Sequence, residues 1–263
     1  MSATSAAINP KGPRLRGSAS NPFDWLNTYL GSSVGQKILV AITGLLLMSF
    51  AVTHMVGNLK MFSGPESINK YAYFLKHDIG AWIWVARAGL FLVFVLHLSV
   101  ALSLKTKAMA ARPVGYAYNN SAQATPQSKT MVQTGIVVGL FIIFHLLHYT
   151  FGMVHGIPAA DGKGERNYLS LTYKLDDGVV VHDVYKMVVA GFSTGWLSAI
   201  YLISQMVLFI HLSHGIQSSL QTLGLVNRRF LPVARLIGYG TAGVIFVGNV
   251  AIVVAVWVGW VKM

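Results

Sequence analysis

The chain contains no cysteine, and this absence removes several kinds of metal and redox chemistry at once. Without thiols, the protein can form no disulfide, no thiolate metal site and no iron–sulfur cluster held by its own cysteines. Covalent haem attachment through a Cys-x-x-Cys-His motif is excluded for the same reason. Histidine, which occurs nine times, is therefore the obvious metal ligand of this chain.

Charged residues are also scarce, and acidic residues are the scarcest. Only 11% of the 263 residues are charged, whereas a soluble domain has roughly a quarter. Hydrophobic residues make up 54% of the chain and the mean hydropathy is +0.57. This composition predicts an integral membrane protein. The net charge of +12 does not indicate nucleic-acid binding, because the basic residues are spread over the segments between apolar stretches.

Five apolar stretches are each about long enough to cross a bilayer as a helix, which takes about 20 residues. They cover residues 38–56, 81–104, 131–154, 195–213 (running on towards 223) and 234–261. We expect an all-α integral membrane fold with five transmembrane helices in an up-and-down bundle. Residues 1–31 are expected to form a polar cytoplasmic segment, and residues 32–263 a single membrane domain. No internal repeat stands out.

The charges between the stretches predict the orientation. With the N-terminus inside, the inner segments, which include the long loop 105–130, hold eleven Lys and Arg. The outer segments, which include the long loop 155–194, hold eight. Seven of the eight acidic residues fall outside: Glu66, Asp78, Asp161, Glu165, Asp176, Asp177 and Asp183. We therefore expect a multi-pass protein of the cell inner (cytoplasmic) membrane with a cytoplasmic N-terminus.

Four of the apolar stretches carry a histidine in their far half: His54, His97, His145 and His211. Histidine is costly in lipid and is tolerated mainly when it faces other helices and has a partner. A rise of about 1.5 Å per residue places each one roughly 22–26 Å into its span. Because alternate helices run in opposite directions, His54 and His145 share one depth (the outer pair), and His97 and His211 share another (the inner pair).

Each pair suits the two axial positions of a six-coordinate haem iron. A single histidine in an apolar stretch is more often a hydrogen-bonded core residue than a ligand. Four that match in depth and alternate with helix direction predict two b haems, with irons roughly 15–20 Å apart. His148 and His214 lie three residues beyond His145 and His211, and depth alone does not choose between the members of each set.

Four stretches carry a resemblance to a known family. The chain is similar, from about Ser32 to the end of the fifth helix, to the cytochrome b membrane subunit of succinate dehydrogenase and fumarate reductase, in its five-helix, two-haem, single-polypeptide form. The stretches are SSVGQKILVAITGLLLMSFAVTHMVGN (32–58), LVFVLHLSVALSLKT (92–106), GLFIIFHLLHYT (139–150) and FIHLSHGIQSSLQTLGL (209–225). The last is the most specific.

The resemblance implies axial roles for His54, His97, His145 and His211, and argues against ligation by His148 and His214. It implies two haem b groups and a membrane quinone, with menaquinone the expected one. It also implies two partners on the inner face: a flavoprotein subunit with FAD and an iron–sulfur subunit. The chain would pass electrons between the iron–sulfur subunit and the quinone, and would bind neither succinate nor fumarate itself.

Other polar residues have two interpretations each. Arg87 lies inside the second span, where it could bind an outer-haem propionate or extend its side chain to the membrane interface. Lys37 and Gln36 lie where inner-haem propionates would emerge, although Lys37 also suits a topological anchor. Glu66 and His182 could exchange protons with a quinone, whereas a solvated loop position is the more common situation for such residues.

Two other functions are compatible with the composition. The chain could be another dihaem cytochrome b electron carrier of the membrane, although several of those take two ligands from a single helix, a pattern absent here. A transporter with histidine proton relays would contain no haem. That function gives no reason for histidines whose depth alternates with helix direction.

Overall fold

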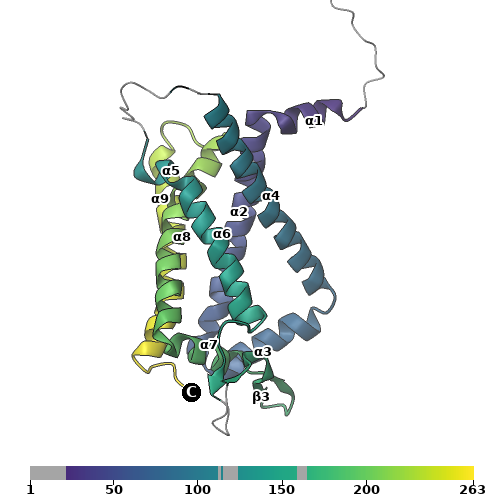
Figure 1. The fold of residues 1–263 in the computed structure, drawn as a ribbon, viewed down its shortest axis with the longest axis vertical. Helices are drawn as coiled ribbons and strands as arrows, with labels where there is room; N and C mark the ends of the chain where they lie inside the picture. Colours follow the sequence, from purple (N-terminus) through teal and green to yellow (C-terminus); the bar gives the residue numbers. More distant parts are fainter. Residues whose placement is uncertain (1–21, 112–113, 115–123, 159–164) are drawn as a thin grey trace, which may run out of the picture.

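The computed structural model describes residues 22–111, 114, 124–158 and 165–263. Within these residues, five helices are long and apolar enough to cross a membrane, as expected of a multi-pass membrane protein. They are α2 (Ser33–Asn58), α4 (Trp82–Ala110), α6 (Met131–His145), α8 (Gly195–Thr222) and α9 (Leu231–Trp257) (Figure 1). Most of the predicted N-terminal segment, residues 1–21, lies outside the described residues.

The helix ends differ from the predicted ends by a few residues, for local reasons. Helix α2 begins five residues early because the Ser32 hydroxyl accepts a hydrogen bond from the Gly35 N–H (3.0 Å) and caps the helix. Helix α9 begins three residues early, with Pro232 in its first turn, where a missing N–H costs nothing. Helix α6 passes at Leu146 into a π-helical turn, η3 (Leu146–Thr150), where this span ends.

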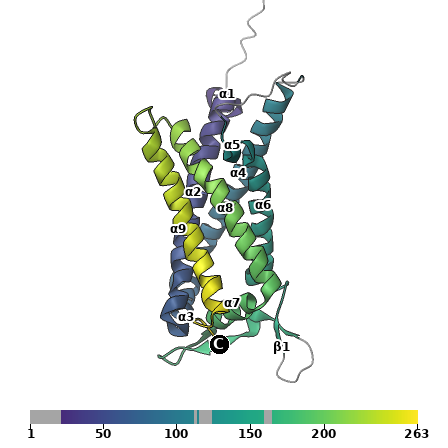
Figure 2. The same cartoon turned by 90° about the vertical axis from the view of Figure 1, so that its left-hand side faces the viewer.

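The long helices pack in a defined order. Helix α2 packs against α4 and α8, and α6 also packs against α4 and α8. Helix α9 packs mainly along α8 and also touches α2 (Figure 2). Helices α2 and α6 are therefore both flanked by the same two neighbours, and side chains from α2 and α6 can meet between them.

Helices α8 and α9 approach closely because small and amide side chains line their contact. A Cβ on Gly238 would lie 2.7 Å from the Ser213 carbonyl oxygen, so only glycine allows this crossing. Nearby, the Asn249 amide donates a hydrogen bond to the Gln205 side-chain oxygen (3.0 Å). Close backbone approach and interhelical hydrogen bonds are the usual means by which helices associate in lipid.

One end of the molecule, the α1 end, carries a short helix that turns sharply away from α2 (Figure 1). This helix, α1 (Asp24–Gly31), is held at its C-terminus by the Lys107 ammonium, which donates to the Gly31 carbonyl (3.0 Å). A Cβ at Gly35 would collide with the Tyr29 carbonyl, so glycine is needed where α1 meets α2. A further short helix, α5 (Pro126–Lys129), precedes α6 at this end.

The opposite end, the α7 end, is a folded cap rather than the loop expected at 155–194. Short helical elements and two small antiparallel hairpins form it (Figures 1 and 2). They are η1 (Leu59–Ser63), α3 (Pro65–Tyr73), η2 (Phe74–Asp78), β1 (Ile157–Pro158), β2 (Glu165–Arg166), η4 (Tyr168–Ser170), β3 (Thr172–Lys174), β4 (Val180–His182) and α7 (Val184–Ser193). The cap therefore joins chain segments on both sides of α4 and α6.

A buried asparagine ties the two halves of the cap together. Asn69 of α3 is fully buried, and its side-chain oxygen accepts hydrogen bonds from the backbone N–H groups of Val184 (2.8 Å) and Tyr185 (3.2 Å). Its amide donates to Asp183 (3.1 Å), which itself caps α7 by accepting from the Lys186 N–H (2.9 Å). The first turn of α7 therefore depends on Asn69, which lies more than 100 residues earlier in the sequence. Sequence periodicity alone could not show this dependence.

Tryptophan marks both ends of the long helices. Trp25 lies on α1, and the other five tryptophans lie at the α7 end, where all are between 52 and 76% exposed. Those five are Trp82, Trp84, Trp196, Trp257 and Trp260. Exposed tryptophans at helix ends are typical of residues at a membrane–water interface. The apolar lengths of the five helices lie between these two levels.

Candidate functional site

The structure brings the predicted outer pair together from two different helices. The rings of His54 on α2 and His145 on α6 lie with their centroids 5.8 Å apart and their planes at 85°. A first-row metal ion lies about 2 Å from an imidazole nitrogen, so two axial imidazoles have centroids roughly 6 Å apart. The spacing of this pair is therefore suited to one metal ion bound between the two rings.

The inner pair is built by α4 and α8. His97 and His211 are close enough to interact electrostatically, and both are partly buried. Because α4 runs on to Ala110, beyond the predicted end at residue 104, His97 lies nearer the middle of its helix than expected. The two pairs still occupy different depths along the helices, since His97 packs beside Gly44 of α2, ten residues before His54.

Each inner histidine contacts a threonine on a neighbouring helix. The Nδ1 atom of His97 lies 3.1 Å from the Thr43 hydroxyl of α2. The Nδ1 atom of His211 lies 3.2 Å from the Thr134 hydroxyl of α6. The structure thus distinguishes His211 from His214, which is half-buried one turn further along α8. Neither threonine was singled out from the sequence.

A tyrosine hydroxyl joins the outer pair to His148. The Tyr201 hydroxyl of α8 lies 3.2 Å from Nδ1 of His145 and 3.0 Å from Nδ1 of His148. The π-helical turn that follows His145 carries His148 and buries it completely, stacked on Tyr149 (centroids 4.0 Å apart). Such turns within helices are frequent at functional sites. No sequence pattern points to Tyr201, because it lies on a different helix from both histidines.

Arg87 is exposed near the start of α4, at the α7 end of the molecule. Its exposed guanidinium lies 4.8 Å from the centre of the Trp84 ring, an arrangement typical of a cation–π contact. Burial, and then the neighbouring Arg87 charge, lower the pKa of Lys76 in η2. These contacts favour the interfacial interpretation of Arg87 over a propionate contact.

Lys37 and Gln36 lie in the first turns of α2, at the α1 end. Lys37 is exposed, whereas Gln36 is partly buried and its amide nitrogen lies 3.5 Å from the Ser103 hydroxyl of α4. The side-chain carbonyl oxygen of Gln36 is buried without a hydrogen-bond partner among the described residues. A buried acceptor of this kind can accept a hydrogen bond from a donor on a bound group.

Glu66 and His182 both lie in the cap. A side-chain oxygen of Glu66 accepts from the Asp176 N–H (3.3 Å), and Glu66 lies near Tyr173 of β3. Nδ1 of His182 lies 3.0 Å from the Leu171 carbonyl oxygen, to which it can donate. Burial lowers the pKa of His182 below its usual value. Both residues therefore hold cap strands in place, and neither contacts the histidine pairs.

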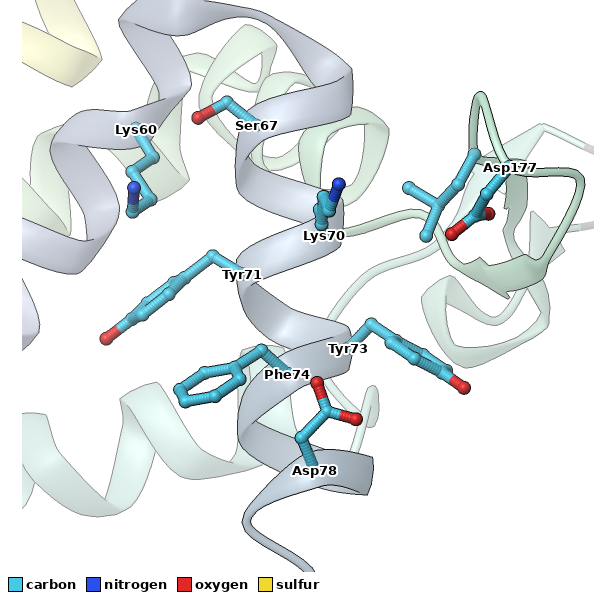
Figure 3. A pocket seen from close by; sticks show the side chains of 9 residues that line it. Lys60, Ser67, Lys70, Tyr71, Tyr73, Phe74, Asp78 and Asp177 are labelled. Atoms are coloured by element: carbon cyan, nitrogen blue, oxygen red, sulfur yellow. The ribbon is translucent and has the colours of Figure 1, made fainter.

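A cavity of about 470 Å³ opens on the same cap, beside α3 (Figure 3). Among the residues that line this cavity, the ammonium of Lys60 lies 5.4 Å from the centre of the Tyr71 ring. Its lining mixes cations with carboxylates: Lys60, Ser67, Lys70, Tyr71, Tyr73, Phe74, Asp78, Leu175 and Asp177. This mixture does not single out one class of ligand. A second, apolar hollow of about 520 Å³ lies between α2 and α9, along Gly240, Gly243 and Gly248.

Comparisons of this chain with protein-family models, with characterised proteins and with solved structures gave no match. The arrangement of the two histidine pairs and their neighbours therefore has to support any functional conclusion.

Proposed function

We propose that this chain is the cytochrome b membrane-anchor subunit of a succinate:quinone oxidoreductase that binds two haem b groups. The observation that carries the proposal is the contact of His54 with His145, whose centroids are 5.8 Å apart. The second pair, His97 and His211, supports the proposal because it lies at a different depth from the first. Four histidines from four helices would then hold two haems, His54 with His145 and His97 with His211.

The residues present suit haem better than a bare metal ion. Within the described residues, no three His, Asp or Glu side chains come together as a metal-binding cluster. Two imidazoles suffice when a porphyrin supplies the other four nitrogens. Bound haem supplies a one-electron redox couple, and two histidine ligands favour electron transfer because they leave no open position for substrate. The chain's part is to hold and orient the four rings.

In this proposal α2, α4, α6 and α8 form an up-and-down bundle around the haems. The contacts of α2 and α6 with the same two neighbours support this arrangement. Helix α9, which carries no histidine, packs outside against α8 and α2. Its role is then to support α8, the helix that carries His211 and Tyr201.

The charge of the α1 end supports partner docking there. Among the described residues, this end has one acidic residue, Asp24, against seven basic ones: Lys37, Lys105, Lys107, Lys129, Arg228, Arg229 and Arg235. Basic segments favour the cytoplasmic side. We place the iron–sulfur and flavoprotein subunits on this face, so that electrons pass through the chain between them and a membrane quinone, menaquinone being the one expected.

An absorption spectrum of the purified complex tests the proposal. A reduced-minus-oxidised spectrum should show b-type bands, and redox titration should resolve two centres. His54→Ala and His97→Ala should each remove a different centre, because each deletes an axial ligand of a different pair. His214→Ala on α8 is the matched control and should keep both centres.

Two results would contradict the proposal in different ways. A wild-type protein without b-type bands would exclude every haem function, including that of another dihaem cytochrome b. Two haems in a protein that never associates with a flavoprotein and an iron–sulfur subunit would favour that second function instead.

A further inference from the structure

Helices α2 and α6 share a short pattern that no apolar periodicity would reveal. Thr43 and Gly44 stand eleven and ten residues before His54, and Thr134 and Gly135 stand eleven and ten residues before His145. Eleven residues are close to three turns of an α-helix, so the threonine and histidine lie on one face, roughly 16 Å apart along the axis. Each helix thus presents one outer histidine and one Thr–Gly step on the same side.

Each Thr–Gly step receives the inner histidine of the next long helix. Thr43 contacts Nδ1 of His97, and a Cβ built on Gly44 would lie only 3.1 Å from Cε1 of the same ring. Thr134 contacts Nδ1 of His211, and a Cβ on Gly135 would lie 3.2 Å from Cε1 of that ring. The glycine lets the ring lie against the helix backbone, and the threonine bonds its near nitrogen.

The hydrogen-bond donors determine which ring nitrogen carries the proton. A threonine hydroxyl has one hydrogen. The Thr43 hydroxyl lies 2.7 Å from the Leu39 carbonyl and the Thr134 hydroxyl lies 2.9 Å from the Thr130 carbonyl, and a carbonyl can only accept. Each hydroxyl therefore donates to its own helix and accepts a hydrogen bond from Nδ1–H of histidine. The Nε2 atom of each ring is left with the lone pair that a metal ion requires.

We propose that the two Thr–Gly steps, Thr43–Gly44 and Thr134–Gly135, are paired positioning sites for the ligands of the inner haem. They fix the tautomer and the orientation of His97 and His211, and they act only on this centre. The outer histidine His145 has a different partner, the Tyr201 hydroxyl. This inference rests on the proposed haem function and adds to it residues that orient the ligands without touching the iron.

Thr43→Val and Thr134→Val test the inference. Each removes a hydroxyl while keeping the shape of the side chain. We expect inner-haem occupancy or affinity to fall by about 10- to 100-fold, as is usual when the partner of a metal-bound histidine is lost. The low-spin ferric EPR signal of the inner centre should shift, and its redox potential should rise because the ligand becomes less basic. The outer centre should keep its signal, which also shows that the variant folds.

Three further variants make the test specific. Thr43→Ser and Thr134→Ser keep the hydroxyl and should restore the inner signal. Thr106→Val on α4 is the matched control and should change neither centre, since among the described residues the Thr106 hydroxyl bonds only the Ser103 carbonyl of its own helix (2.9 Å). If both valine variants leave the inner EPR signal and occupancy unchanged while the wild type shows two haems, the inference is wrong and the proposed function stands. A wild type without haem would overturn both.

Discussion

At the residue scale, buried polar side chains are the distinctive feature of this chain, because each must find a partner that water would otherwise provide. The Tyr201 hydroxyl serves two histidines at once, His145 and His148. Close by, the Tyr149 hydroxyl is buried without a hydrogen-bond partner among the described residues. Two tyrosines in one cluster thus have opposite roles in hydrogen bonding.

Tyr201→Phe and Tyr149→Phe should therefore differ. Loss of the Tyr201 hydroxyl leaves two buried ring nitrogens without their partner, and we expect a destabilisation of about 1–3 kcal/mol. Loss of the Tyr149 hydroxyl removes an unpaired polar group and should be neutral or stabilising. Thermal unfolding in detergent measures both. Equal losses of stability in the two variants would show that ring packing, rather than hydrogen bonding, dominates this cluster.

His182 should make the cap sensitive to acid. Its pKa is lowered by burial, so the unfolded ring takes up a proton near the usual value of about 6.5 while the folded ring stays neutral. The unfolded state then binds more protons, and the stability of the cap should fall as the pH drops below about 6.5. Nearby Lys76 disfavours the protonated ring and Asp183 favours it.

Protease resistance of the segment around β4, measured on either side of that pH, tests this prediction. His182→Gln keeps a hydrogen-bond donor for the Leu171 carbonyl and should flatten the pH dependence. An unchanged pH dependence in this variant would assign the acid sensitivity to another group.

The residues that could be predicted from the sequence are those whose type alone is unfavourable in a membrane. Histidines in apolar stretches stand out because any histidine is expensive there. Thr43, Thr134 and Tyr201 do not stand out, because threonine and tyrosine are common in membrane helices. Their importance comes from a histidine on another helix, which only the folded arrangement reveals.

At the element scale, the long helices were predictable and the cap was not. Their apolar length follows directly from bilayer thickness. Helix α7 instead depends on Asn69, which lies more than 100 residues away and accepts from the N–H groups of Val184 and Tyr185. A helix that starts on a distant side chain leaves only a weak local signal, and residues 155–194 therefore looked like a loop.

Gly238→Ala should weaken the contact of α8 with α9. The added Cβ would lie 2.7 Å from the Ser213 carbonyl, and helices forced apart in this way lose about 1–3 kcal/mol. Gly240→Ala is the matched control, because a Cβ there meets nothing within 4 Å. Thermal unfolding in detergent compares the two variants. A loss of stability in Gly240→Ala equal to that in Gly238→Ala would contradict the proposed close crossing.

At the scale of the whole molecule, the two ends differ in a way that suits a protein crossing a membrane. Five tryptophans, a folded cap and all the described acidic residues except Asp24 lie at the α7 end, whereas the α1 end is almost purely basic. Composition alone indicated a membrane protein, but the distribution of Lys and Arg gave only a small difference between the sides. The structure adds the tryptophan levels, which place the apolar part of the helices between them.

The recurrence of the Thr–Gly and His pattern in α2 and α6 has a consequence for assembly. The pair α2 and α4 and the pair α6 and α8 each carry one Thr–Gly step, one outer histidine and one inner histidine, and each proposed metal centre takes one ligand from each pair of helices. Neither pair of helices alone can complete a centre. Under the proposed haem function, binding of the cofactor and association of the two helix pairs would be one event, and the free energy of haem binding would add directly to the stability of the assembled bundle.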